Sequence, residues 1–267
     1  MAFDRDRYLE RIDYAGSMQP TLDAVTALLQ AHMAAIPFEN LDVVLGRGVD
    51  LELDALQCKL VSNRRGGYCF EHASLFAAAL EALGFDVRRH AARVVRAMAR
   101  DVAPRNHMFL TLHLPEGTFV LDPGFGGGAP RAPLPLEDGA KVRVDRELHW
   151  LERQGRHWVM RTLLGDSEAD CWIATLEGDN PLDFVVANHF IATHPASPFA
   201  KNLMLRALTP DGAVAIMNRN MTVYRGREVQ NTRLPDRQAL RSVIAQSFGF
   251  DLPEIERLRV PSIPEWE

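Results

Sequence analysis

The chain has 267 residues, which is enough for one large domain or for two or three small ones with a substantial buried core. Apolar residues make up 47% and charged residues 24%, as in ordinary folded proteins, so the composition excludes a disordered or fibrous chain. The formal net charge of -5 argues against nucleic acid as a partner. No apolar run approaches the roughly 18 residues of a membrane span, and the charged start "MAFDRDRYLERID" is unlike a secretory signal. We therefore expect a cytosolic protein that does not contact membranes.

The three cysteines are Cys58, Cys69 and Cys171. They lack the CxxC spacing of a zinc site and the density of a disulfide-rich scaffold. We therefore expect free thiols and no metal.

The first part of the chain, residues 1–85, has the periodicity of helices. Apolar residues recur at helical spacing over 21–36, and Pro37 ends that pattern. A weaker helical pattern covers 53–63, and a third runs from Cys69 to Leu83, with Gly84 placed as the residue after the helix end. The pattern predicts a helical unit over 1–85.

From residue 86 the period changes to two. Alternating patterns separated by short turns predict antiparallel strands over 87–95, 106–114, 117–122, 148–153 and 157–163. With no helical pattern between them, these strands favour a barrel or sandwich over 86–190.

The stretch "NHFIATHPASPFAKN" is rich in Pro, Ser and Asn and shows little periodicity, so it is interpreted as an interdomain linker, placed at 191–203. The remaining 204–267 combines strands with one helix. That helix is expected to start at Asp236 and to end at Gly249.

The sequence around Cys69 indicates a reactive thiol. Gly66 and Gly67 allow a sharp turn just before the predicted helix, where unpaired amide groups and the helix dipole stabilise a thiolate. The alternative, a small buried hydrophobic residue, is the usual fate of a free cysteine and is assigned to Cys58 and Cys171.

A cysteine nucleophile needs a base and a group that orients the base. His107 opens a predicted strand, whereas His72 shares the helix of Cys69 and leaves little room for a substrate. Asp122 ends the next strand, before the glycine-rich "PGFGGG". A turn centred on Glu116 would place Asp122 opposite Leu110, roughly 10 Å from His107, so a bulge, a twist or a longer loop is required.

Five motifs occur together: "IPFENLDV", "RGGYCFEH", "NHMFL", "LDPGFGGG" and "THPASPFAKNLM". In this order and at this chain length the sequence resembles the arylamine N-acetyltransferase family. The resemblance implies an α+β fold with an N-terminal helical bundle, a central antiparallel β-barrel and a C-terminal α/β lid. Its core would be of the cysteine-proteinase-like, transglutaminase-like kind.

The resemblance also implies roles for individual residues. Cys69 would carry the acetyl group, His107 would act as its base and Asp122 would orient His107. Acetyl-CoA would acetylate Cys69, and an arylamine, arylhydroxylamine or hydrazine would then take the acetyl group. The other implied contacts are Phe38 and Phe125 with the acceptor, and Gly126, Gly127 and Phe199 with CoA. The protein would be a monomer or a homodimer and would need no metal.

Three alternatives share the same residues. The first is macrolactam-forming amide synthesis on the same scaffold, and the second is hydrolysis by the same triad. The third is a binding module in which Cys69 is merely buried.

Overall fold

The N-terminal part of the chain is helical, as the periodicity predicts. The structure is a computed structural model that describes residues 2–96, 98–145, 147–164 and 167–266. Its first helices are α1 (Arg5–Arg11), α2 (Leu22–Ala35), α3 (Leu41–Val44), α4 (Leu53–Leu56), the π-helical turn η1 (Gln57–Ser62) and α5 (Cys69–Ala82). Thr21 caps α2 by accepting a hydrogen bond from the amide of Ala24. Gly84 follows α5 with φ +84°, the left-handed conformation that glycine adopts readily.

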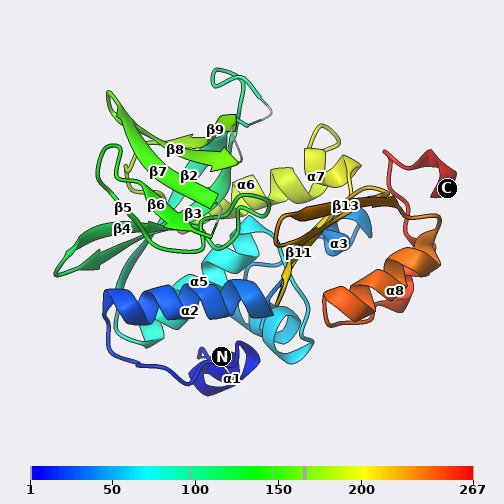
Figure 1. Ribbon diagram of the computed structural model, residues 1–267, viewed down its shortest axis with the longest axis horizontal. Coiled ribbons are helices and arrows are strands. Elements are labelled where there is room, and N and C mark those ends of the chain that lie inside the picture. Colours follow the sequence, from blue (N-terminus) through cyan, green and yellow to red (C-terminus); the bar gives the residue numbers. More distant parts are fainter. Residues whose placement is uncertain (1, 97, 146, 165–166, 267) are drawn as a thin grey trace.

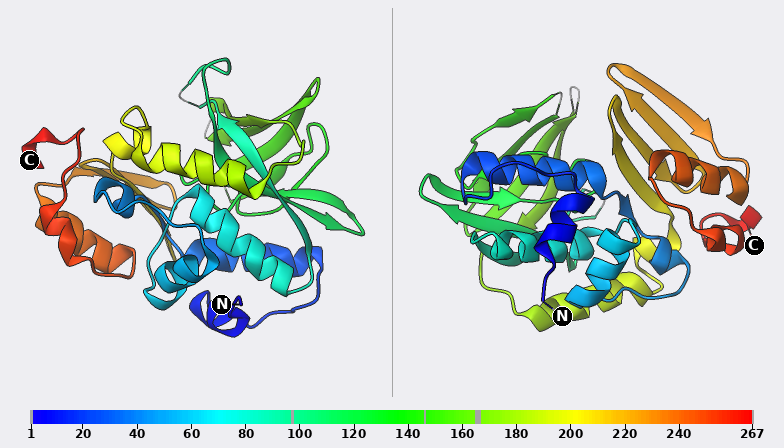
Figure 2. Two further views of the ribbon diagram at one scale, coloured as in Figure 1. Left: turned by 180° about the vertical axis from the view of Figure 1, so that it is seen from behind. Right: turned by 90° about the horizontal axis from the view of Figure 1, so that it is seen from below.

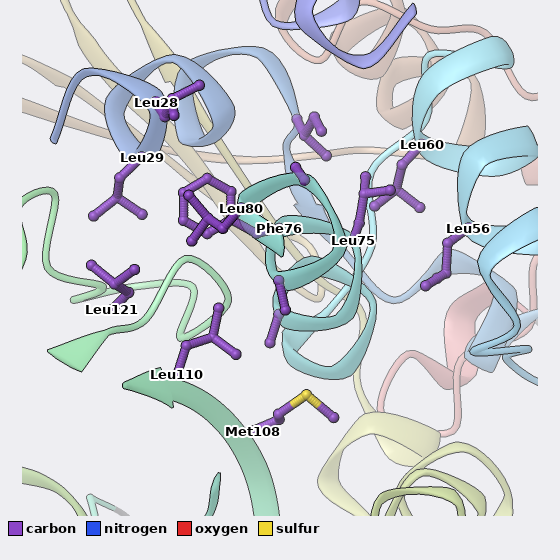
Figure 3. Packing of buried hydrophobic residues seen from close by; sticks show 14 of the residues in the cluster. Leu28, Leu29, Leu56, Leu60, Leu75, Phe76, Leu80, Met108, Leu110 and Leu121 are labelled. Atoms are coloured by element: carbon purple, nitrogen blue, oxygen red, sulfur yellow. The ribbon is translucent and has the colours of Figure 1, made fainter. Parts of the chain in front are cut away.

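Helix α5 lies at the centre of the largest hydrophobic core. Its side chains pack between α2 on one side and strands of the central sheet on the other (Figure 3). Phe70, Leu75, Phe76 and Leu80 are all fully buried. Because α5 is apolar around nearly its whole circumference, its position is fixed by contacts on every side.

The central part of the chain forms one antiparallel sheet that curls into a nearly closed barrel (Figure 1). In spatial order the strands are β5 (Leu134–Pro135), β4 (Gly117–Leu121), β3 (Arg105–Leu114), β2 (Asp86–Val94), β9 (Ser167–Ala174), β8 (His157–Leu164), β7 (Glu147–Gln154) and β6 (Val142–Val144). The predicted strands are therefore confirmed, and a barrel is the better of the two architectures considered.

Strand β3 is buried on both faces. Met108, Leu110 and Leu112 point into the helical core, whereas Phe109 belongs to the barrel core with Trp172. A strand buried on both faces joins two cores and so fixes the barrel relative to α5.

The C-terminal part is a second antiparallel sheet covered by one helix. The sheet contains β10 (Met204–Thr209), β11 (Gly212–Met217), β12 (Asn220–Arg225) and β13 (Glu228–Arg233), and α8 (Arg237–Ser247) packs on it. Short 3₁₀ turns η2 (Pro253–Arg257) and η3 (Pro264–Trp266) complete this core. The two-residue strand β1 (Phe38–Glu39) pairs with β10, so the N-terminal part supplies one edge strand of this sheet. Figure 2 shows both sheets beside the helical part.

The stretch 188–202 is more regular than predicted. Helix α6 (Pro181–Thr193) extends into it, and α7 (Pro198–Lys201) follows after a short turn, while the interpretation of 191–203 as an interdomain linker stays a prediction. The pattern was misread because Leu182, Val185 and Val186 are largely exposed and leave α6 without a clear apolar stripe. The boundaries 1–85, 86–190, 191–203 and 204–267 remain predictions, while the α+β class is confirmed. In the described ranges no helix is both long and apolar enough to cross a bilayer.

A buried cluster of charges lies beneath the turn that precedes α5. Arg65 donates to Glu39 at 2.6 Å and to Asp42 at 3.1 Å, and Lys59 lies 2.7 Å from Glu71 and 2.8 Å from Asp42. Glu39 and Glu71 are almost inaccessible to solvent. Burial alone would lower the pKa of Arg65, but the neighbouring carboxylates outweigh it and raise that pKa. The cluster ties β1, α3, η1 and α5 together.

Arg65→Met should destabilise the fold by about 3–5 kcal/mol, because it leaves the buried carboxylate of Glu39 without its main cation and removes one of the cations that pair with Asp42. Urea unfolding followed by circular dichroism measures this difference. The matched control is Arg89→Gln, since the pair of Arg89 with Glu81 is partly exposed and should contribute less than about 1 kcal/mol. A loss for Arg65→Met no larger than that of the control would show that the cluster does not hold these elements together.

Candidate active site

Cys69 is the first residue of α5, and close backbone approaches fix this helix end. The amide of Tyr68 donates to Glu71 Oε2 at 3.0 Å, which caps the helix. A Cβ on Gly66 would lie 2.1 Å from the carbonyl oxygen of Pro37, and one on Gly67 would lie 2.7 Å from Glu71 Oε2. The two glycines are therefore required for close packing and not for an unusual backbone conformation.

His107 and Asp122 meet because the hairpin differs from the predicted register. Leu114 pairs with Gly117 and Leu110 with Leu121, so this register brings Asp122, the residue after β4, opposite Phe109 and not opposite Leu110. This shift of one residue moves Asp122 to the face of the sheet that carries His107. A β-bulge between β2 and β3 leaves Asn106 without a partner just before His107.

The carboxylate of Asp122 is fully buried and holds His107 directly. Its Oδ2 lies 2.9 Å from His107 Nε2 and also accepts a hydrogen bond from Trp172 Nε1 at 2.9 Å. Trp172 comes from β9, which pairs with β2 and is thus separated from β3 by one strand. Nothing in the sequence singled it out beyond its position in a probable strand.

His107 is fully buried yet carries a raised pKa. Burial alone would lower the pKa, but the charge of Asp122, the hydrogen bond to Asp122 and the hydrogen bond to Cys69 raise the pKa of His107 to about 10. Since Nε2 is engaged by Asp122, Nδ1 is the ring nitrogen left for Cys69. This arrangement favours an imidazolium at neutral pH, placed beside the candidate nucleophile Cys69.

In Asp122→Asn the pKa of His107 should fall well below about 10, because the negative charge that opposes the lowering effect of burial is then absent. Histidine NMR titration measures this change. His72 serves as an internal control, since the groups that shift its pKa do not include Asp122. An unchanged pKa of His107 would show that Asp122 does not stabilise the imidazolium.

The stability of the wild-type protein should also depend on this proton. The pKa of His107 is raised from 6.5 to about 10, so protonation favours the folded state. The resulting stability is fully present below pH 6.5 and is lost as the pH rises through about 10. In Asp122→Asn, by contrast, the free energy of unfolding should not show this decrease as the pH rises.

The glycine-rich loop after Asp122 packs directly on the start of α5. A Cβ on Gly124 would lie 2.6 Å from Cys69 Cα, so only glycine fits there. The ring of Phe125 meets the edge of His107, with ring centroids 5.2 Å apart. Two side chains anchor the loop: Arg96 donates to the carbonyl of Gly127 at 2.6 Å, and His149 Nε2 lies 3.0 Å from the carbonyl of Gly128.

Gly124→Ala should separate the loop from α5 and reduce both stability and the reactivity of Cys69. Thermal unfolding and the rate of alkylation by iodoacetamide at neutral pH measure the two effects. Gly127→Ala is the matched control in the same loop, because a Cβ there meets only Arg206, at 3.8 Å. Equal behaviour of the two variants would contradict the close packing on Cys69.

Comparison with known proteins shows the family of this chain. A family model for N-acetyltransferases matches residues 21–257. An arylamine N-acetyltransferase of Mycobacterium tuberculosis is 38% identical over 260 residues, which cover 96% of this chain and 92% of the relative. The chain belongs to the arylamine N-acetyltransferase family.

Solved structures of this family have the same fold. The M. tuberculosis enzyme superimposes with a TM-score of 0.89 at 38% identity, covering 94% of this chain and 96% of the other. The arylamine N-acetyltransferase of Mycobacterium marinum, solved in complex with CoA, superimposes with a TM-score of 0.89 at 35% identity, covering 94% of each chain. The N-terminal helices, barrel and C-terminal unit implied by the resemblance are thus confirmed as the architecture of this arylamine N-acetyltransferase.

The remaining predicted site residues gather around the same loop. Phe38 and Phe199 have ring centroids 6.2 Å apart, and a Cβ on Gly126 would lie 3.4 Å from the Phe38 ring. Asn40 links the segment after Phe38 to the segment that carries Phe199. Its side-chain amide donates to the carbonyls of Phe199 and Asn202 and accepts from the amide of Met204. Sequence reasoning missed Asn40, although it stands inside one of the quoted motifs.

A chain of buried hydrogen bonds ends at the carbonyl of Pro37, the residue before Phe38. Tyr8 bonds to His32 at 2.8 Å, His32 to His72 at 2.9 Å, and His72 to the carbonyl of Pro37 at 3.2 Å. Burial lowers the pKa of His72 to about 4 and that of His32 well below its ordinary value, so both rings are neutral at pH 7. His72 is therefore a supporting residue.

The other two cysteines show no sign of a role in the reaction. Cys58 is exposed, whereas Cys171 is buried in the barrel core, where burial raises the pKa of its thiol to about 12. The described residues contain no cluster of three or more His, Cys, Asp or Glu side chains arranged for a metal ion.

Proposed function

We propose that this family member transfers the acetyl group of acetyl-CoA through a thioester on Cys69 to an arylamine, arylhydroxylamine or hydrazine. The observation that carries the proposal is His107, which is hydrogen-bonded to the buried carboxylate of Asp122 and whose pKa is raised by Asp122 and by the neighbouring Cys69. The CoA complex of the related M. marinum structure supports CoA as the donor.

In the first half-reaction the Cys69 thiolate attacks the acetyl carbonyl carbon. The bond between that carbon and the CoA sulfur breaks, and CoA takes the proton of the His107 imidazolium. His107 becomes neutral, and Asp122 and Trp172 keep its ring in place.

In the second half-reaction the amine attacks the thioester carbonyl and gives a proton to neutral His107. The carbon–sulfur bond to Cys69 then breaks, and the imidazolium–thiolate pair is restored. A weakly basic aromatic amine suits this step because it is unprotonated at neutral pH.

The aromatic side chains suggest where the acceptor binds. Phe125 faces His107 and Phe38 faces the glycine loop, so a flat ring between them would place its amine near Cys69. We assign Gly126, Gly127 and Phe199 to CoA on the resemblance described above. No backbone partner is found for the amides of Gly126 and Gly127 among the described residues, which suits contact with an anionic group.

Free cysteines are typical of reducing compartments, which supports a cytosolic location for the protein. We retain monomer and homodimer as the two proposed states of assembly.

Incubation with acetyl-CoA alone should add one acetyl group to Cys69, and an arylamine such as 5-aminosalicylate, or the hydrazide isoniazid, should remove it. Intact-protein and peptide mass spectrometry follow both steps. Cys69→Ala should lower turnover by at least about a thousandfold while the fold is retained. Cys171→Ala is the control that should still be acetylated.

CoA release that does not depend on the amine would indicate a hydrolase. Retained turnover in Cys69→Ala would rule out the thioester route.

A further inference from the structure

Tyr68, the residue before Cys69, is hydrogen-bonded to α6 through its side chain. Its hydroxyl donates to the side-chain oxygen of Asn188, and the side-chain amide of Asn188 donates to the carbonyl of Val49 at 2.9 Å. Both side chains are buried. Because the carbonyl of Val49 can only accept, the amide nitrogen of Asn188 has to face it and the oxygen is left for Tyr68. The motifs of the sequence give Asn188 no role.

The ring of Tyr68 packs against Phe199 of α7. The ring centroids of Phe70 and Phe199 lie 5.8 and 5.4 Å from that of Tyr68. The backbone of Phe199 is also linked to α6, since Ser197 donates to the carbonyl of Ile191 and accepts from the amide of Phe199. Phe199 is only partly buried, which leaves part of this residue accessible to a ligand.

The bond to Asn188 fixes the place of the Tyr68 ring. The last torsion of a tyrosine side chain has a broad energy minimum, so packing alone permits the ring to tilt. A hydroxyl held at the far end of the ring prevents this tilt. Burial raises the pKa of Tyr68, so the hydroxyl keeps its proton and stays a donor at neutral pH. The position of the Phe199 ring therefore depends on a hydrogen bond made by a residue that does not touch it.

We propose that Asn188 is a positioning residue for the donor half-reaction, because through the hydroxyl of Tyr68 it sets the place of the Phe199 ring against which acetyl-CoA lies. This inference rests on the proposed function, which assigns Phe199 to CoA. The proposed acceptor side is held by different contacts, since Phe38 belongs to β1, which pairs with β10, and Phe125 belongs to the glycine loop. Loss of the bond should therefore affect the donor more than the acceptor.

Steady-state kinetics of Tyr68→Phe test the positioning. In a ping-pong reaction kcat/KM for the donor and for the acceptor report separate half-reactions. We expect kcat/KM for acetyl-CoA to fall about five- to tenfold, and that for the arylamine p-anisidine to stay within about twofold. The matched control is Tyr14→Phe, which removes a hydroxyl that donates to Ser17 between α1 and α2 and should change neither value.

A second variant separates positioning from a merely structural role. Tyr68→Phe leaves the oxygen of Asn188 buried without a donor and should also lower stability. Adding Asn188→Leu removes this oxygen and should recover part of the stability, since Val49 lines a hollow at the surface where water can replace the lost amide. The double variant should keep its low kcat/KM for acetyl-CoA. Recovery of that value together with the stability overturns the inference.

The path through Phe199 is tested by a double-mutant cycle. If Tyr68→Phe acts by displacing the Phe199 ring, its effect should not add to that of Phe199→Leu. The combined variant should have a kcat/KM for acetyl-CoA within about twofold of Phe199→Leu alone. Full additivity of the two effects would contradict a path through this ring.

Binding of CoA to Cys69→Ala separates this inference from the proposed function, since it needs no turnover. Calorimetry should show that Tyr68→Phe in this background weakens CoA binding about five- to tenfold and leaves p-anisidine binding within about twofold. An equal loss for both ligands, or a loss for neither, overturns the positioning. Absence of acetyl transfer in the wild type, with the selective loss of CoA binding intact, would contradict only the proposed function.

Discussion

The structure depends on buried charged side chains that hold the turn before α5 in place. Glu71 accepts the amide of Tyr68 and also binds Lys59, and through Asp42 the same cluster reaches Arg65. Burial raises the pKa of Glu71 to about 7, against the lowering effect of Lys59, which shows how strongly its surroundings exclude water. The helix start that presents Cys69 is thereby fixed by electrostatic contacts from three other segments.

Much of the fold could be predicted from local patterns. The apolar stripe of α2, the glycine after α5 and the alternation of β2, β3, β7 and β8 each follow from short-range rules. Helix α6 was misread because its exposed valines and leucine do not produce a stripe. Strand β1 was missed because two residues carry no periodicity and form a strand only by pairing with β10, more than 160 residues later.

In the candidate site, too, local sequence patterns predict some features and not others. Cys69, His107 and Asp122 could be chosen from their places at a helix start and at strand ends. Their contact could not, because it depends on a one-residue difference in register and on the bulge at Asn106. Trp172 and Asn40 act through hydrogen bonds to distant segments, and no local sequence rule reports such partners.

The buried chain from Tyr8 to Pro37 has only one possible direction. The carbonyl of Pro37 can only accept, so neutral His72 must donate from Nε2 and accept at Nδ1, and His32 must do the same. Tyr8, which stands on α1, is then the donor to His32 Nδ1. The residue preceding Phe38 is thus held in place from α1, so loss of that helix would loosen the wall of the proposed acceptor site without removing any residue assigned to it.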